Sequence, residues 1–328
     1  MRIPKFWDKN PPKILKGLSI LYQAAQCLYE WKRTPSVPFR MKFPVISVGG
    51  LTLGGAGKTS CSLALAQWLT SLGYKCIMLT RGYKGQSPGP MWVSEKDTPH
   101  SVGEEAWMMA QHFPVFIAKN ILQGAQYLHH TLISNENTLI IWDDGHQYPK
   151  VHKDLAFIVT NTQQYFGNTW VFPAGPLRES LSGGIKRAHG IICLSPQVPV
   201  ELPETLSFWT SSCFPVECRA SCSLPKNTPV VGFCGLGNPE RFWNTLHYCG
   251  LTLKAQVTFP DHYFYTSKDE VYLQQVAQNH QAVLITSRKD YVKLSSCMQT
   301  LTHQVLQSIV LSLELQKIIS EMLKQYNT

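Results

Sequence analysis

The chain has 328 residues, of which 44% are hydrophobic and 16% charged, a composition that argues against global disorder. Its length allows a large core and favours two domains. The net charge of +9 favours an anionic partner (nucleic acid, anionic lipid or a phosphorylated substrate) without choosing among them. The ten cysteines are scattered and form no Cys-x-x-Cys pair, so we expect reduced thiols rather than a zinc site.

Residues 13–33 predict an amphipathic helix near the N-terminus. Apolar residues such as Leu18 and Leu21 recur at helical spacing, and basic and aromatic residues flank the stretch. Charges interrupt it too often for a transmembrane span, and Pro11 and Pro12 stand where the apolar core of a signal peptide would begin. Two interpretations stay open: a helix lying in a membrane surface, or a helix packed on the protein's own core.

The most informative segment follows an apolar, β-branched run that predicts a buried strand at Val45–Val48. A glycine-rich turn comes next, and a helical pattern starts at its end. Glycines let backbone N–H groups face phosphate oxygens, and the helix N-terminus adds partial positive charge. The residues expected to bind nucleotide are Thr52, Gly54, Gly55, Ala56, Gly57, Lys58 and Thr59. Lys58 would reach the β- and γ-phosphates, and the Thr59 hydroxyl would hold Mg²⁺. The strict pattern begins with Gly where this chain has Thr52, yet strand, turn and helix together predict binding of a nucleoside triphosphate.

Beyond this loop, short apolar runs alternate with helix-compatible segments, which is typical of a parallel sheet covered by helices on both faces. The strands expected in this first lobe are Val45–Val48, Cys76–Thr80, Val115–Ala118, Leu139–Trp142, Phe157–Thr160 and Ile191–Leu194. Residues 195–229 lack clean periodicity and are expected to form a connector. A second alternation predicts strands at Val230–Cys234, Leu253–Phe259, Ala282–Thr286 and Ile309–Leu311, before a closing helix at Glu314–Gln325.

The predicted fold is therefore α/β, with a P-loop NTPase-type domain, including the N-terminal helix, over residues 1–222. A second, smaller α/β lobe is expected over residues 223–328, with a ligand cleft between the two.

One predicted strand ends in paired carboxylates, Asp143 and Asp144. In P-loop enzymes an acidic residue at a strand's carboxyl end holds Mg²⁺, directly or through water. In a parallel sheet that end faces the same crevice as the P-loop. A solvated turn is the alternative, and the presence of the P-loop favours the metal site.

Three further segments carry chemically useful side chains. Glu104 stands at a loop or helix start, where a carboxylate acts either as a base or as an ordinary helix-terminal charge. His262 follows an Asp in an aromatic-rich turn, which is either a catalytic imidazole or surface structure. Arg178 lies in a Pro/Gly-shaped loop and suits a phosphate, and Tyr83 follows the second strand at the same sheet edge.

Together and in this order, the segments closely resemble the tetraacyldisaccharide 4′-kinases, the lipid A 4′-kinase family of Gram-negative-type bacteria. The resemblance spans nearly the whole chain and rests on residues 47–59, 80–83, 143–147, 173–179, 235–242 and 259–262. It implies transfer of the ATP γ-phosphate to the 4′-hydroxyl of a tetraacylated glucosamine disaccharide 1-phosphate. It also implies a peripheral position on the cytoplasmic face of the bacterial inner membrane, which favours the membrane interpretation of the N-terminal helix. Neither nucleic acid nor an obligate protein partner is expected.

The resemblance further implies roles for individual residues. Glu104 would work with His262 to activate the acceptor hydroxyl, Asp143 would bind Mg²⁺, and Asp144 would support metal or catalytic geometry. The residues implied to line the acceptor head-group site are Tyr83, Gln147 and Arg178. This chain departs from the family at Glu104, where an Asp is usual, and at Arg288, where a Glu is usual. The extra methylene of Glu104 changes the reach of the carboxylate, which can matter for positioning.

Two other functions share parts of this pattern. A membrane-associated P-loop ATPase without lipid kinase activity would need the loop, the paired Asp and the amphipathic helix, but not the Asp-His or Pro-Leu-Arg-Glu segments. A non-catalytic nucleotide-binding module would fit the changes at Glu104 and Arg288. A nucleic-acid-binding protein is the least favoured, because no recognition motif is present.

Overall fold

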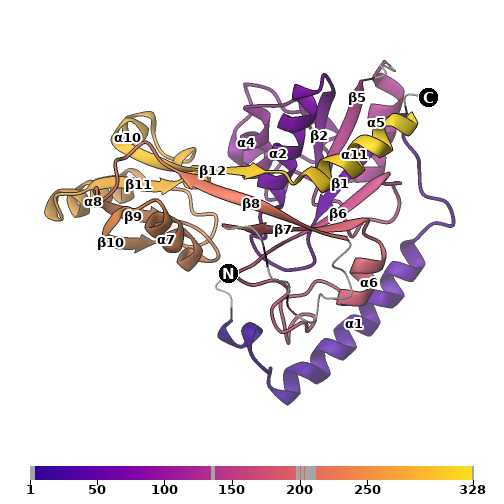
Figure 1. Cartoon of the computed structure of the whole chain (residues 1–328), viewed down its shortest axis with the longest axis horizontal. Coiled ribbons are helices and arrows are strands. Elements are labelled where there is room, and N and C mark those ends of the chain that lie inside the picture. The colour runs from indigo at the N-terminus through magenta and orange to yellow at the C-terminus, as the bar shows by residue number, and fades with distance from the viewer. Residues whose placement is uncertain (1–3, 134–136, 197–199, 201–202, 204–211, 327–328) are drawn as a thin grey trace. The chain divides into compact units, whose positions relative to one another are not determined.

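A computed structural model of the chain describes residues 4–133, 137–196, 200, 203 and 212–326 (Figure 1). The chain forms two compact units: a large unit of residues 5–218 and 309–328, and a small unit of residues 1–4 and 219–308. The chain thus passes from one unit to the other near residue 218 and back near residue 308. We predicted a single division at residue 222, and the structure differs because the C-terminal segment rejoins the first unit.

The large unit is built on a mostly parallel sheet with strand order β8-β7-β6-β1-β5-β2-β4-β3, in which β3 runs antiparallel to β4. Its strands are β1 (Val45–Gly49), β2 (Lys75–Thr80), β3 (Met91–Trp92), β4 (Val115–Ile117), β5 (Thr138–Asp143), β6 (Leu155–Asn161), β7 (Gly190–Ser195) and β8 (Cys213–Ser221). The predicted strands at β1, β2, β4, β5, β6 and β7 are confirmed. Central strands such as β1 and β5 are buried along their whole length, as expected of a parallel sheet covered on both faces.

The predicted connector at residues 195–229 is wrong over β8. This strand carries Pro215, and only its first residues are well buried, so its sequence lacks a clean strand pattern. Residues 197–199, 201–202 and 204–211 of the predicted connector lie outside the described residues.

Helices cover both faces of this sheet. The helices of the large unit are η1 (Lys5–Asp8), α1 (Lys13–Arg33), α2 (Lys58–Ser71), α3 (Pro99–Val102), α4 (Glu104–Ala110), α5 (Ile121–Thr131), α6 (Leu181–Lys186) and α11 (Leu313–Tyr326). One core packs side chains of α2, α4 and α11 against residues such as Ile46 and Ile141. On the opposite face, α5 and α6 pack against residues such as Ile140 and Ile158. The alternation of β1 and β5 residues between these cores follows from the period of two in a strand.

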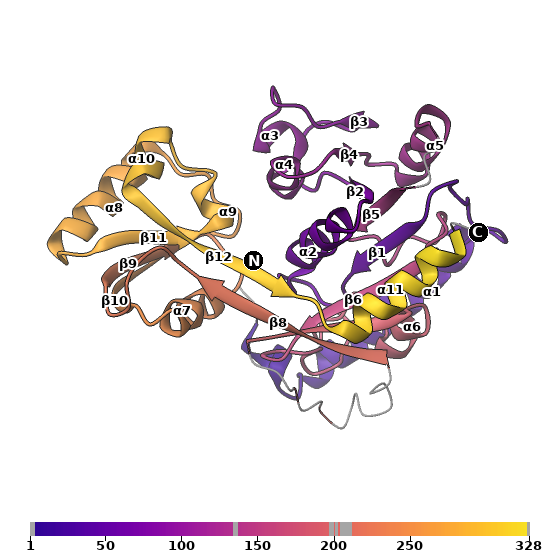
Figure 2. The ribbon, with the colours of Figure 1, turned by 45° about the horizontal axis from the view of Figure 1, so that its top comes forward.

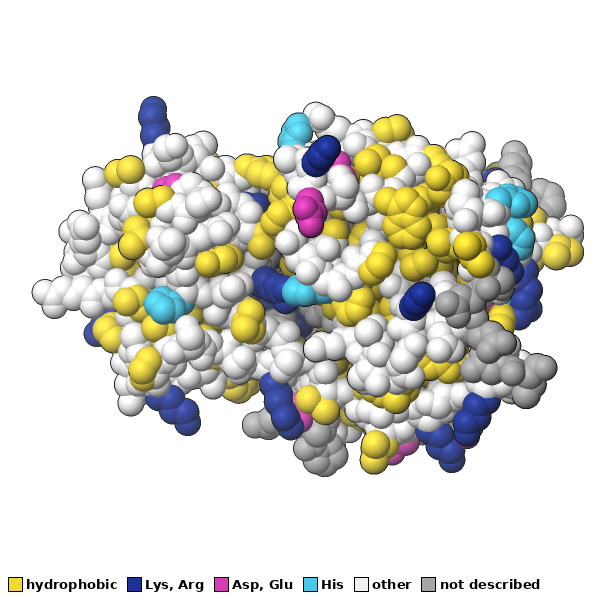
Figure 3. Space-filling model, turned by 90° about the horizontal axis from the view of Figure 1, so that it is seen from above, with side chains coloured by type: hydrophobic (Ala, Val, Ile, Leu, Met, Phe, Trp, Pro, Cys, Tyr) yellow, Lys and Arg dark blue, Asp and Glu magenta, His cyan; other side chains and the backbone are white. Residues whose placement is uncertain are grey.

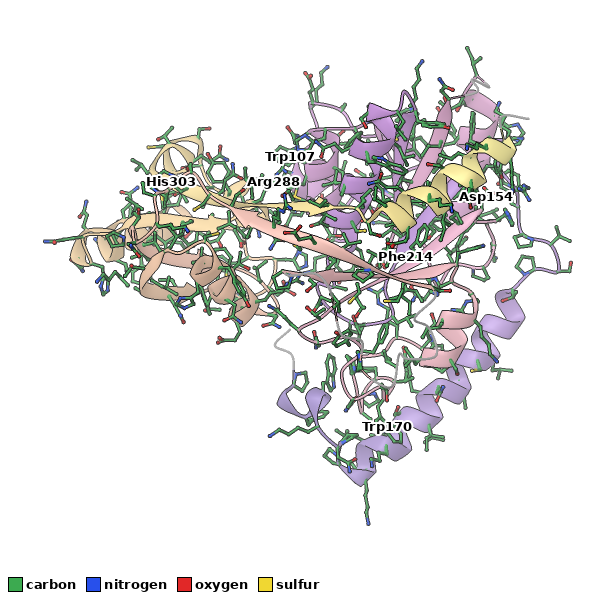
Figure 4. The ribbon with its side chains drawn as sticks, in the orientation of Figure 1. Trp107, Asp154, Trp170, Phe214, Arg288 and His303 are labelled. Carbon is green, nitrogen blue, oxygen red and sulfur yellow. The ribbon has the colours of Figure 1, made fainter. Side chains whose placement is uncertain are left out.

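Helix α11 belongs to the large unit, although we predicted it in the second lobe. Its Leu315, Ile319 and Leu323 are buried in the same core as the α2 residues. Figure 2 shows the helix lying along the sheet of this unit. At its end, the Tyr326 hydroxyl donates to Asp154, which also pairs with Arg40 and is labelled beside α11 in Figure 4.

The small unit contains a second parallel sheet, of order β10-β9-β11-β12. Its elements are β9 (Pro229–Cys234), α7 (Pro239–Tyr248), β10 (Thr252–Thr258), α8 (Ser267–Asn279), β11 (Val283–Ser287), α9 (Arg288–Tyr291), α10 (Ser296–Leu301) and β12 (Thr302–Val310). Helix α7 packs on one face, and α8 and α10 pack on the other. The predicted strands agree with β9, β10 and β11, but β12 begins seven residues before the predicted Ile309, because its polar residues hide the strand pattern.

Helix α1 does not bury its apolar stripe in the protein. Ile14, Leu18 and Leu21 are exposed, while the polar Ser19 is buried and donates to the Val171 carbonyl. Trp170, labelled in Figure 4, lies beside the helix, with its ring centroid 5.3 Å from Lys16 Nζ. The helix therefore packs through polar and aromatic contacts and leaves its apolar face uncovered. None of the helices in the described part of the chain is long and apolar enough to cross a membrane.

Candidate active site

The glycine-rich turn after β1 has the backbone geometry of a phosphate-binding loop. Gly54 and Gly57 adopt φ of 112° and 93°, which side-chain-bearing residues rarely adopt. Gly57 caps α2, so Lys58 and Thr59 form the first turn of that helix and its amides face the loop. A Cβ on Gly50 would lie 3.1 Å from Lys58 Cδ, so the lysine folds back over the start of the loop. The predicted loop thus forms where expected.

The unusual Thr52 is accommodated by pairing with a second segment. It is buried and forms an antiparallel bridge with Leu177. Arg178 N–H donates to the Leu51 carbonyl at 2.7 Å, and Leu53 N–H donates to the Pro176 carbonyl at the same distance. The Pro/Gly-shaped loop therefore lies along the P-loop, which places Arg178 in the site.

The carboxylate of Asp143 lies at the mouth of the P-loop. Its strand β5 pairs with β1 so that Asp143 is opposite Val48, and its side chain is buried. Its Oδ2 accepts from Thr59 Oγ1 at 3.0 Å, and its Oδ1 accepts from Ser62 Oγ at 2.8 Å. Burial, with the nearby charges of Glu105 and Asp144, raises the pKa of Asp143 from 3.8 to about 7.

Asp144 stands between two cations. Arg178 Nη1 donates to both of its carboxylate oxygens at 3.0 Å, and Lys58 Nζ is 3.7 Å from Oδ1. Asp144 has a positive φ of 56°, and its N–H donates to the Val48 carbonyl at 2.8 Å. The structure therefore brings Lys58, Asp144 and Arg178 into one charge network.

The turn that continues from Asp144 contacts the P-loop again through Gln147. Its Nε2 donates to the Gly50 carbonyl at 2.9 Å and to Glu179 Oε1 at 3.1 Å. Glu179 is buried and forms an ion pair with Arg187. Gln147 and Arg178 thus each hydrogen-bond a backbone carbonyl at the start of the loop, Gln147 that of Gly50 and Arg178 that of Leu51.

Glu104 is the first residue of α4, at the helix start that we predicted, and it is buried. The preceding Gly103 has a φ of 94°, and a Cβ there would lie 2.5 Å from the Tyr83 carbonyl oxygen, so the two loops are in close contact. Tyr83 itself is 66% exposed. Its loop lies beside Glu104, while its ring faces solvent.

His262 belongs to the small unit. Its N–H donates to the Gly235 carbonyl at 3.0 Å, its φ is 62°, and its Nε2 is 3.8 Å from Asp261 Oδ1. The joint action of Glu104 and His262 stays a prediction. Arg288, labelled in Figure 4, is the first residue of α9, which Ser287 caps through Asp290.

Sequence reasoning missed several residues of the site. Ser62 lies one helical turn beyond the P-loop, so a polar residue on the inner face of α2 was the available signal. The charge of Glu105 contributes to the raised pKa of Asp143, whereas the family resemblance pointed to Glu104. Lys153 donates to the carbonyls of His146 and Tyr148, a contact that no sequence motif indicates.

The chain is similar to known proteins over nearly its whole length. The profile of the family described as Tetraacyldisaccharide-1-P 4′-kinase matches residues 12–327. A tetraacyldisaccharide 4′-kinase of Hyphomonas neptunium is 34% identical over 306 residues, covering 90% of this chain and 89% of that protein. One of Rickettsia bellii is 33% identical over 294 residues, covering 89% of each. Among solved structures, LpxK of Aquifex aeolicus in complex with ATP is 26% identical, with a TM-score of 0.71 over 94% of this chain and 98% of that one.

A parallel sheet with a phosphate-binding loop at its carboxyl edge, an acidic strand end and a lysine–arginine pair defines a P-loop phosphotransferase. The match to one family over nearly the whole length of the chain identifies the kind of P-loop phosphotransferase. The chain belongs to the tetraacyldisaccharide 4′-kinase family.

Proposed function

We propose that the chain transfers the γ-phosphate of ATP to the 4′-hydroxyl of a tetraacylated glucosamine disaccharide 1-phosphate, a step of lipid A biosynthesis. The observation that carries the proposal is the joining of Lys58, Asp144 and Arg178 at the P-loop. Two cations beside the loop suit a reaction in which negative charge on a transferred phosphoryl group must be stabilised.

The residues present fit Mg²⁺. Thr59 Oγ1 and Asp143 Oδ2 are 3.0 Å apart and offer hard oxygen ligands, which this ion prefers. Two protein ligands suffice, because Mg²⁺ in such enzymes takes its other ligands from phosphates and water. When bound, the ion would neutralise charge on the β- and γ-phosphates.

The remaining roles fall to residues of this chain. The P-loop amides and Lys58 would hold the phosphates, and Asp144 would orient Lys58 and Arg178. Glu104 and His262 would act together as the general base that activates the acceptor hydroxyl. Tyr83, Gln147 and Arg178 would line the acceptor head group, and the exposure of the Tyr83 ring suits contact with an incoming ligand.

The same proposal places the protein at the cytoplasmic face of the bacterial inner membrane. Helix α1 supports this, since Ile14 is 78% exposed and Leu21 is 69% exposed on a helix flanked by lysines. An exposed apolar stripe with basic neighbours is typical of a helix that lies in a membrane surface. On the face seen in Figure 3, Lys and Arg side chains are spread over the coloured surface, some singly and some in small groups.

The test is a phosphoryl-transfer assay with labelled ATP, Mg²⁺ and detergent-dispersed tetraacyldisaccharide 1-phosphate. We expect a labelled bisphosphorylated lipid from the wild type and a loss of at least about 10²-fold in Lys58→Ala, because the P-loop lysine stabilises transferred charge. Lys75→Ala is the matched control, since Lys75 is exposed at the start of β2. Hydrolysis of ATP without a lipid product would favour the ATPase alternative, and wild-type turnover by Lys58→Ala would refute the assignment.

A further inference from the structure

Lys153 lies half-buried under the turn that carries the paired aspartates. It stands two residues before β6, and its Nζ donates to the His146 carbonyl at 2.9 Å and to the Tyr148 carbonyl at 2.8 Å. The same Nζ is 5.3 Å from the centroid of the Trp142 ring, at the end of β5. One ammonium group thus binds the turn at two points and contacts the residue before Asp143.

The turn has little freedom where it meets the P-loop. Asp144 N–H donates to the Val48 carbonyl at 2.8 Å, and Gln147 Nε2 donates to the Gly50 carbonyl at 2.9 Å. Between them, a Cβ on Gly49 would lie 2.3 Å from His146 Cβ, so the two backbones are as close as a glycine permits. A small displacement of the turn would therefore move Asp144 and Gln147 relative to the loop.

The turn is anchored on its other side by buried groups. His146 Nε2 bonds the Gly184 carbonyl at 2.9 Å, and a Cβ on Gly145 would lie 2.4 Å from the Trp142 ring. Burial, reinforced by the positive charge of Arg187, lowers the pKa of Lys153 to about 8, although the charge of Glu179 opposes this. A lysine kept in so unfavourable a place, with two carbonyls as partners, points to a function for those two hydrogen bonds.

We propose that Lys153 is a positioning residue for phosphoryl transfer. By holding the carbonyls of His146 and Tyr148, it fixes the turn against the P-loop and so sets the place of Asp144 between Lys58 and Arg178. The effect of Lys153 on the rate of phosphoryl transfer rests on the proposed function, whereas its effect on how firmly the backbone of the turn is held does not.

Three variants separate positioning from general stability. Lys153→Met keeps the aliphatic chain and removes the N–H donors. Lys153→Arg keeps a charged group with N–H donors for both carbonyls. Lys150→Met is a control for loss of charge in the same segment. For Lys153→Met we expect kcat to fall roughly 10- to 100-fold, because a misplacement of about 1 Å can reduce the rate by that much. The Kd for ATP without Mg²⁺ should change less than about threefold, since the P-loop amides are untouched. Lys153→Arg and Lys150→Met should both stay near the wild-type rate.

Two further measurements decide the outcome. In an Asp144→Asn background, Lys153→Met should reduce kcat much less than in the wild type, because the group that it positions is already lost. Fully additive losses would overturn the proposal, as would a Lys153→Met enzyme with normal kcat.

The second measurement is amide hydrogen exchange of residues 143–148, which should rise in Lys153→Met and stay unchanged in Lys150→Met. This readout needs no substrate, so it still tests the placement of the turn if the wild type makes no lipid product. Unchanged exchange at these amides would overturn the proposal whatever the activity shows.

Discussion

Replacing Asp143 by Asn should make the protein more stable at pH 8 while removing its activity. The side chain is buried, and its pKa is raised from 3.8 to about 7, mainly by burial and then by the charges of Glu105 and Asp144. The native state therefore prefers the neutral acid. The stability contribution of this group falls as pH rises from 3.8 to 7, and the full penalty is present above pH 7.

The size of the effect follows from that shift. A rise of roughly three pKa units corresponds to at most about 4 kcal/mol at pH 8. Asn keeps the shape of the side chain and one acceptor for Thr59 or Ser62, so we expect Asp143→Asn to gain roughly 1–4 kcal/mol there. The gain should shrink as pH falls from 7 towards 4.

Urea unfolding at pH 5, 6, 7 and 8, in EDTA and without nucleotide, measures this difference. Asp97→Asn is the control with opposite sign. Hydrogen bonds, chiefly from the Ser94 backbone, lower the pKa of the partly exposed Asp97 carboxyl, so loss of its charge should destabilise the protein at pH 8. An Asp143→Asn protein that is less stable than wild type at pH 8 would refute the reasoning. So would a difference in the free energy of unfolding between variant and wild type that is the same at every pH. The stabilised variant should lose kinase activity, because a proposed Mg²⁺ ligand is gone.

Two further predictions test the core and the buried histidine. Ile319→Ala should lower the stability of the large unit by about 2–5 kcal/mol, because Ile319 is fully buried in its core. Urea unfolding, followed by the fluorescence of the tryptophans of the large unit, measures this loss. An unchanged unfolding midpoint would contradict the packing of α11 in that core. Burial lowers the pKa of His146 from 6.5 to about 4, so its protonation should remove up to about 3 kcal/mol of stability as pH falls from 6.5 to 4. His146→Gln should show a shallower loss across that window, and an identical slope would argue against a buried neutral imidazole.

Local pattern was enough to predict the backbone geometry of the P-loop. A β-branched run, a glycine-rich turn and a helix with Lys58 at its start form a unit whose geometry depends on neighbouring residues. Asp143 could be added because the carboxyl ends of parallel strands share one edge of a sheet, and the pairing of Val48 with Asp143 confirms this. Most strands of both lobes followed from apolar runs of the right length, whereas β3 and β8 did not.

Contacts between residues distant in the chain could not be predicted in this way. Strand β8 contains Pro215 and is buried only at its start, so pairing with β7 rather than its own sequence makes it a strand. The sequence of α11 predicts an amphipathic helix, but this pattern does not predict which unit's sheet the helix packs against.

By itself, then, the sequence predicted a P-loop and an acidic strand end beside it, because both depend on local geometry. The tertiary structure decided which charges meet there. The pairing of Asp144 with Lys58 and Arg178 joins three segments of the chain, and the support of their turn by Lys153 depends on how β5 and β6 flank β1. Such contacts are set by the packing of whole elements, which leaves no local trace in the sequence.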